Sequence, residues 1–109
     1  MDIEVILKAL GDPTRFRIFQ NLLKRKHCVR SLSKAMNITE SAVSQHMKVL
    51  READLVYGEK FGYHTHYLPK QETLDFLSQT IITMAEQSER LDRTGGICNC
   101  EFREIEAAR

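Results

Sequence analysis

The hydrophobic positions of the N-terminal quarter repeat with the period of an α-helix. Apolar side chains recur at the i, i+3, i+4, i+7 spacing of one helix face: Ile3, Ile6, Leu7 and Leu10. Asp12 then precedes Pro13, a pair typical of an N-cap followed by the first helical position. The pattern therefore predicts a short helix over the first ten residues, ending near Gly11, and a second helix from Pro13 to about Lys24.

Two further short helices, separated by about three residues, are predicted in the middle of the chain. Val29 to Met36 has helical spacing, and Asn37 tolerates the left-handed conformation that ends a helix. Thr39 is a typical N-cap for the next helix. One face of that helix is apolar, and the opposite face carries small or hydrophilic side chains: Ser41, Ser44, Gln45 and Lys48. Two helices in this arrangement form a helix-turn-helix pattern.

The pattern changes to that of strands after Asp54. Residues 55–57 and 63–68 are rich in β-branched and aromatic side chains, and Gly62 between them suits a turn. After Pro69 a helical period returns on one face of a long last helix: Leu74, Leu77, Ile81, Met84, Ala85, Ser88 and Leu91. We therefore predict a mainly α fold with a β-hairpin, a winged helix-turn-helix, over residues 1–92. Residues 93–109 form a cysteine-containing tail with no clear period.

Composition narrows the class of protein. With 109 residues, of which 42% are hydrophobic, the chain can bury one modest core and leaves no room for a catalytic module, so we expect no enzyme. Residues 13–68 carry ten Lys/Arg and four Asp/Glu, whereas the remainder carries six and eleven. A basic middle suits a polyanion partner. There is no apolar run typical of a membrane span or signal peptide, and three cysteines suit no disulfide scaffold. We expect a cytoplasmic protein with reduced thiols.

Several of these segments together resemble a known family. Residues 9–15 (ALGDPTR), residues 41–52 (SAVSQHMKVLRE) and the hairpin with Gly62 and Tyr67 are similar to the ArsR/SmtB transcriptional repressors. The resemblance covers about residues 5–92. It implies a winged helix-turn-helix homodimer, paired through its first and last helices, that leaves its operator DNA when a metal, metalloid or oxidant is sensed. The apolar faces of the two terminal helices agree with such pairing, because a monomer would expose them to water.

The expected partner is double-stranded operator DNA, bound without any cofactor. Gln pairs bidentately with adenine, Ser contacts base edges or phosphates, and Lys neutralises phosphates. These chemistries select candidate residues on the second helix of the pair and in the hairpin turn: Ser41, Ser44, Gln45, His46, Lys48 and Lys60. The alternative is an ordinary solvated helix face, with His46 half-packed against the core and Lys60 an exposed turn lysine.

The cysteines are candidates for sensing an inducer. In the family that the chain resembles, a Cys-Val-Cys at the start of the third helix is a soft-metal site, and here Cys28 is retained but Arg30 takes the second position. Cys98 and Cys100 add two closely spaced thiols. We expect Cys28, Cys98 and Cys100 to form one site, within or between subunits. Three thiolates suit arsenite, antimonite, lead or cadmium better than tetrahedral zinc.

Other functions remain open at this level. A repressor of the same fold can respond to thiol oxidation in place of metal binding. A chain of a different class, a thiol carrier or a protein-interaction module, needs no DNA. His64 and His66 lie two apart on a predicted strand and therefore share a face, but no third metal ligand is evident near them.

Overall fold

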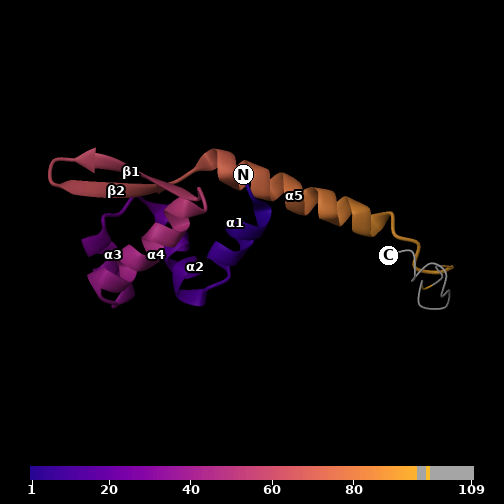
Figure 1. Ribbon diagram of the computed structural model, residues 1–109, viewed down its shortest axis with the longest axis horizontal. Helices are drawn as coiled ribbons and strands as arrows, with labels where there is room; N and C mark the ends of the chain where they lie inside the picture. Colours follow the sequence, from indigo (N-terminus) through magenta and orange to yellow (C-terminus); the bar gives the residue numbers. More distant parts are fainter. Residues whose placement is uncertain (96–97, 99–109) are drawn as a thin grey trace.

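The computed structural model describes residues 1–95 and 98, and within them five helices and one antiparallel hairpin follow each other along the chain (Figure 1). The elements are α1 (Ile3–Leu10), α2 (Pro13–Lys24), α3 (Val29–Met36), α4 (Glu40–Glu52), β1 (Val56–Phe61), β2 (His64–Pro69) and α5 (Gln71–Glu89). The expected fold class, a mainly α winged helix-turn-helix, is confirmed.

The helix starts follow the capping residues of the sequence. The Asp2 carboxylate accepts a hydrogen bond from the Glu4 amide at 3.0 Å, and the Asp12 carboxylate accepts one from the Arg15 amide at 2.9 Å. Each bond satisfies an amide that has no partner within its own helix. Pro13 occupies the first turn of α2, where no amide is needed. The limits predicted for α1 and α2 are therefore confirmed.

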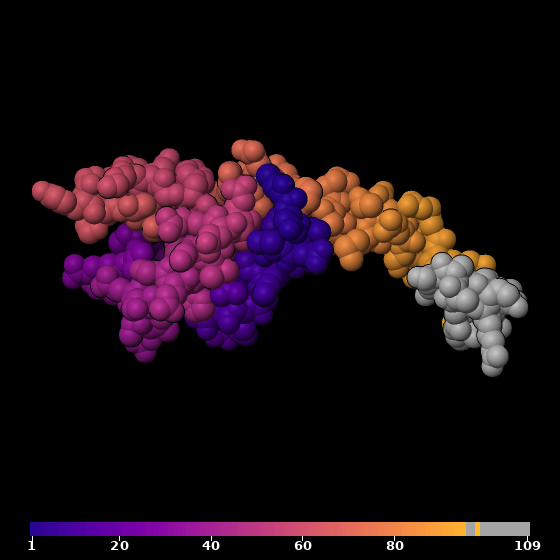
Figure 2. All heavy atoms as spheres, in the orientation of Figure 1, coloured from indigo at the N-terminus to yellow at the C-terminus, as the bar shows by residue number. Residues whose placement is uncertain are grey.

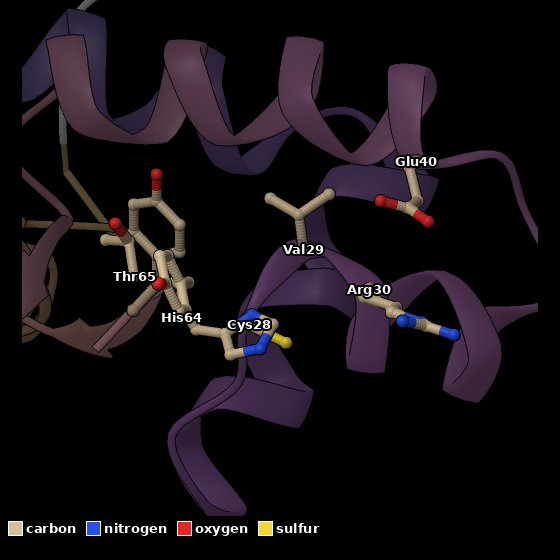
Figure 3. Close-up of a pocket in the computed structure, with 8 residues that line it drawn as sticks. Cys28, Val29, Arg30, Glu40, His64 and Thr65 are labelled. Atoms are coloured by element: carbon tan, nitrogen blue, oxygen red, sulfur yellow. The ribbon is translucent and has the colours of Figure 1, made fainter. Parts of the chain in front are cut away.

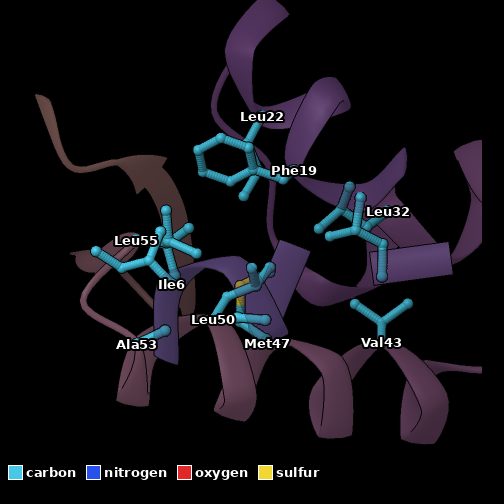
Figure 4. Packing of buried hydrophobic residues seen from close by; sticks show 12 residues of the cluster. Ile6, Phe19, Leu22, Leu32, Val43, Met47, Leu50, Ala53 and Leu55 are labelled. Carbon is cyan, nitrogen blue, oxygen red and sulfur yellow. The ribbon is translucent and has the colours of Figure 1, made fainter. Parts of the chain in front are cut away.

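One hydrophobic core joins the first four helices to the start of the hairpin (Figure 4). Leu32 of α3, Val43 of α4 and Leu50 of α4 have no exposed surface. Burying a side chain of this size stabilises the fold by roughly 1.5–3 kcal/mol. The core consists of Ile6, Ala9, Ile18, Phe19, Leu22, Leu32, Val43, Met47, Leu50, Ala53, Leu55 and Val56. It holds α4 firmly through its inner face and leaves the opposite face to solvent.

Helix α5 begins at the core and then runs away from it (Figures 1 and 2). Thr73 in its first turn is fully buried, and its hydroxyl donates to the carbonyl of Asp54. Leu74 and Leu77 pack against the core, whereas Ile81 and Met84 are about half exposed, at 49% and 57%. The helix ends at Glu89, so Leu91, which the periodicity placed on its apolar face, lies beyond it. Among the described residues no helix is long and apolar enough to cross a membrane.

The hairpin is longer and turns later than the sequence predicts. Its strands pair from Val56 with Pro69 to Phe61 with His64. Gly62 has a φ of 64°, a left-handed value that glycine adopts without steric cost, and the turn is formed by Gly62 and Tyr63. The sequence pattern ended the first strand at residue 57 because Gly58, Glu59 and Lys60 have low β propensity. Pairing with β2 outweighs that local preference.

Candidate DNA-binding face and thiol pocket

Helices α3 and α4 form the helix-turn-helix. Asn37 ends α3 in the left-handed conformation, with φ 54° and ψ 47°, and the Thr39 hydroxyl accepts a hydrogen bond from the Ala42 amide at 3.1 Å to begin α4. Both roles follow from the short polar side chains of Asn and Thr. The tight connection sets α4 at the surface of the molecule, beside α3 (Figure 1).

The outer face of α4 has the side chains that the sequence analysis assigned to DNA. Four of them are exposed: Ser41, Ser44, Gln45 and Lys48. Val43, Met47 and Leu50 on the inner face are buried in the core, so the outer face has a fixed direction. A helix held in this way, with short polar groups and one lysine on its free side, has the form that enters a DNA major groove.

His46 differs from these four residues. It is half-buried on the flank of α4, and its Nδ1 lies 3.3 Å from a terminal nitrogen of Arg15. The guanidinium of Arg15 also donates to the carbonyl of Ala9 at 2.5 Å and to that of Lys8 at 3.4 Å. Arg15 therefore ties the C-terminal end of α1 to the flank of α4. Since a guanidinium only donates, Nδ1 of His46 accepts and the ring proton lies on Nε2.

The tip of the wing, as we call the β1–β2 hairpin, presents a residue that the sequence analysis missed. Tyr63 in the turn is fully exposed, while Lys60 is an exposed residue of β1 that pairs with Thr65. The dipeptide Gly62-Tyr63 is the sequence feature that locates the turn. Below the tip, the Lys26 ammonium lies 3.9 Å from the centre of the Phe61 ring. This cation–π contact joins the wing to the segment between α2 and α3.

Cys28 caps α3 and lines a pocket between that helix and the wing (Figure 3). The pocket has a volume of about 440 Å³, and its walls include Cys28, Val29, Arg30, Glu40, His64 and Thr65. The Ser31 amide donates to Sγ of Cys28 at 3.4 Å. Partial burial raises the pKa of the Cys28 thiol, but hydrogen bonds from Ser31 and Arg30 outweigh it, so the pKa lies below its usual value. Such a thiol is more readily available as the thiolate, the form that binds metals.

The three cysteines of the expected inducer site are not brought together within the described part of one chain. Cys98 is exposed in the segment that follows α5, and α3 with Cys28 lies at the opposite end of the long axis (Figure 1). Cys100 lies outside the described residues. The described part of one chain therefore does not form the expected three-cysteine site.

Three of the histidines lie in different environments: His27, His64 and His66. His64 lines the pocket that Cys28 also lines, whereas His66 stacks on Phe61 with ring centres 4.8 Å apart. Nδ1 of His66 is buried and has no hydrogen-bond partner among the described residues. Nδ1 of His27 lies 2.8 Å from the Ser31 hydroxyl. Burial, helped by Arg25 and His66, lowers the pKa of His27. Among residues 1–95 and 98 no three Cys, His, Asp or Glu side chains gather as metal ligands.

Comparison with known proteins identifies the family. Residues 12–57 match the family model "Bacterial regulatory protein, arsR family". The arsenical resistance operon repressor of Bacillus subtilis is 36% identical over 76 residues, which are 68% of this chain and 72% of that protein. The chain belongs to the ArsR family. The Bacillus subtilis relative is by its name an operon repressor, and no relative named in this section is described as an enzyme.

Other members of the ArsR family agree in sequence and fold. The SmtB homologue of Synechocystis sp., a transcriptional repressor, is 39% identical over 59 residues, or 54% of this chain and 45% of its own length. The chain thus spans about half the length of the first SmtB relatives that it matches. An ArsR-like transcriptional regulator from Rhodococcus sp. has the same fold, with a TM-score of 0.74, 23% identity and coverage of 81% and 83% of the two chains.

Proposed function

We propose that this ArsR-family protein is a cytoplasmic transcriptional repressor that binds operator DNA as a homodimer and releases it when a soft metal or metalloid binds its cysteine thiolates. One observation carries the DNA-binding part. The outer face of α4 presents Ser41, Ser44, Gln45 and Lys48 to solvent, while the inner face is locked into the core. The repressor function of the Bacillus and Synechocystis relatives supports the same reading.

Charge and shape support this assignment. Residues 13–68, which include α2 to α4 and nearly the whole wing, carry a net charge of +6 from ten Lys/Arg and four Asp/Glu. An excess of positive charge strengthens binding to the phosphate backbone without selecting a sequence. In the proposed complex α4 reads bases, and the wing, with Lys60 and Tyr63 near its tip, contacts the adjacent backbone or minor groove.

The homodimer is proposed from exposed apolar side chains on the two terminal helices. Val5 and Leu7 of α1 are 44% and 48% exposed, and on α5 Ile81 and Met84 are about half exposed. Helices α1 and α5 contact each other beside the core, and α5 then extends away from it (Figure 1). Pairing two copies through these two helices removes apolar surface from water and generates a two-fold protein.

The inducer site remains the one expected from the sequence, Cys28 with Cys98 and Cys100, and is now proposed between subunits. The lowered pKa of Cys28 favours thiolate ligation, and three thiolates suit arsenite, antimonite, lead or cadmium. The Cys98→Ser, Cys100→Ser protein should hold DNA as the parent does, yet stay bound when one of these ions is added. Release at the parent's ion concentration would refute a role for the tail thiols.

DNA binding is tested by selecting a bound sequence from random duplexes and measuring its affinity by fluorescence anisotropy over a range of salt. The parent should prefer an imperfect palindrome with half-sites about one helical turn apart. Gln45→Ala should lose ~1–3 kcal/mol on the selected site and relax one base preference. Lys48→Ala is the matched control and should weaken all duplexes alike and flatten the salt slope.

Two results contradict the proposal. Equal losses for Gln45→Ala on selected and random DNA would show that this residue does not read a base. Failure to enrich any duplex, with no salt-dependent affinity, would favour a protein-interaction module or thiol carrier over a repressor.

A further inference from the structure

We infer that His46 is a positioning residue, which holds the flank of α4 to α1 through Arg15 only while its ring is neutral. Gain of a proton by His46 then releases α4 from α1 and weakens DNA binding. The DNA part of this inference rests on the proposed function, whereas the release of α4 is a property of the free protein.

Arg15 lies between the two helices that it connects. Its guanidinium donates to the carbonyl of Ala9 at 2.5 Å, near the end of α1, and one terminal nitrogen lies 3.3 Å from Nδ1 of His46 on α4. The backbone of Arg15 is fixed at the start of α2, because its amide donates to the Asp12 carboxylate at 2.9 Å. Arg15 thus keeps its place at the end of α1, and its hydrogen bond to His46 connects that place to α4.

This hydrogen bond requires a neutral imidazole. A guanidinium only donates, so Nδ1 of His46 has to accept, whereas both ring nitrogens of an imidazolium donate. Protonation also brings a second positive charge to within 3.3 Å of the Arg15 guanidinium, and like charges at a partly buried site repel each other more strongly than in water. One proton therefore removes the acceptor and adds repulsion.

The other charged groups around His46 do not replace the lost contact. The pKa of the Asp12 carboxyl is lowered, mainly by the hydrogen bond from the Arg15 amide and further by charge on His46 and Arg15, but Asp12 has no hydrogen bond with His46. The side chain of Lys8 on α1 is exposed. Within the described chain, α3 and β1 pack on α4 but give His46 no ion pair or hydrogen bond. The neighbours three and four residues away on α4 itself are apolar: Ala42, Val43, Val49 and Leu50.

Release of α4 from α1 matters because the two helices have different roles in the proposed repressor. Helix α1 contributes the exposed Val5 and Leu7 to the proposed dimer surface, and α4 presents its outer face to DNA. The distance between the two copies of α4 then depends on how each is fixed to its own α1, and two half-sites accept only a narrow range of spacing. When DNA binding favours the neutral form of His46, proton binding and DNA binding weaken each other by the same factor.

The direction of this effect is opposite to that of general electrostatics. Histidine changes charge between about pH 8 and pH 5. Added positive charge ordinarily strengthens binding to the phosphate backbone. On charge alone, protonation of any histidine should therefore raise DNA affinity or leave it unchanged. A loss of affinity that requires His46 is thus specific to the proposed release.

The test measures affinity for the selected duplex by fluorescence anisotropy at constant salt, from about pH 8 to about pH 5.5, where histidine gains its proton. His46→Asn places a carbonyl oxygen near the position of Nδ1, and this oxygen accepts from Arg15 at every pH. Coupling between two sites is typically about 5–150-fold, so the parent should lose at least about fivefold in affinity relative to His46→Asn. His64→Asn is the control, because it removes an exposed histidine outside this contact, and it should lose at least as much affinity as the parent.

A second measurement uses the parent without DNA and does not depend on how well a variant folds. The 15N-labelled protein is titrated with acid and observed by NMR. Backbone signals of Ala9 and Leu10, at the end of α1, should change with the same midpoint as the His46 ring, because the loss of its contact with Arg15 alters that end of the helix.

Two results would overturn the inference: equal pH dependence of DNA affinity in the parent and in His46→Asn, or α1 signals that do not follow His46. A parent that binds no duplex at the highest pH would instead refute the proposed function. The α1 signals would then decide by themselves whether His46 releases α4.

Discussion

Replacing Arg15 by methionine should remove the hydrogen bonds through which its side chain connects α1 to α4. The guanidinium makes three contacts: 2.5 Å to the Ala9 carbonyl, 3.4 Å to the Lys8 carbonyl and 3.3 Å to Nδ1 of His46. Methionine keeps the apolar stem that packs along the helices, so the change removes mainly these polar contacts.

The magnitude follows from the geometry of the three contacts. A hydrogen bond that involves a charged group contributes about 1.5–3 kcal/mol. Only the bond from Arg15 to Ala9 is short, and the other two are long and partly exposed to water, so they add little. We therefore expect Arg15→Met to lower the free energy of unfolding by ~2–3 kcal/mol. Arg17→Met is the control, because it removes the same charge from the same helix at an exposed position whose guanidinium has no hydrogen bond within the described chain.

The assay is urea unfolding followed by circular dichroism, at one fixed protein concentration because a dimer's stability depends on concentration. Arg15→Met should unfold at clearly lower urea than Arg17→Met, with a similar slope. In the parent, NMR should place the His46 ring proton on Nε2. Equal stabilities of Arg15→Met and Arg17→Met, or a proton on Nδ1 of neutral His46, would refute the role assigned to Arg15.

Three further predictions concern the core and the two titrating groups near the wing. Leu50→Ala should cost ~2–5 kcal/mol in the same urea assay, because Leu50 is fully buried and its removal leaves a cavity; a loss below about 1 kcal/mol would show that the core collapses around the gap. Burial lowers the pKa of His27 below 6.5, so the unfolded chain binds a proton first and stability is lost as the pH falls through 6.5 toward the folded value; NMR titration of His27 with a midpoint above 6.5 would contradict this. Because the pKa of Cys28 is lowered, its thiol should react with iodoacetamide at a lower pH in the folded protein than in the urea-unfolded chain. The same pH profile in both states would contradict this prediction.

Much of the fold and of the DNA-binding face is readable from the sequence because it depends on neighbours in the chain. Helical periodicity and capping residues are local, so the limits of α1 to α4 follow from the order of the side chains. The outer face of α4 follows in the same way, since its polar residues lie opposite its buried ones. The hairpin is only partly readable, because strand length depends on pairing with a distant segment, and this is why Lys60 belongs to a strand while Tyr63 occupies the tip.

Contacts between distant segments were decided by the tertiary structure alone. The sequence allows His46 to be half-packed against the core, but no local rule indicates that it meets Arg15, which is 31 residues away. Sequence spacing grouped His64 with His66, yet folding places His64 at the pocket that Cys28 also lines and stacks His66 on an aromatic ring. Within one chain the same folding sets α3 and the C-terminal end of α5 at opposite ends of the long axis (Figure 1). The physical reason is that side-chain period fixes only the face of an element, whereas core packing between elements decides which faces meet.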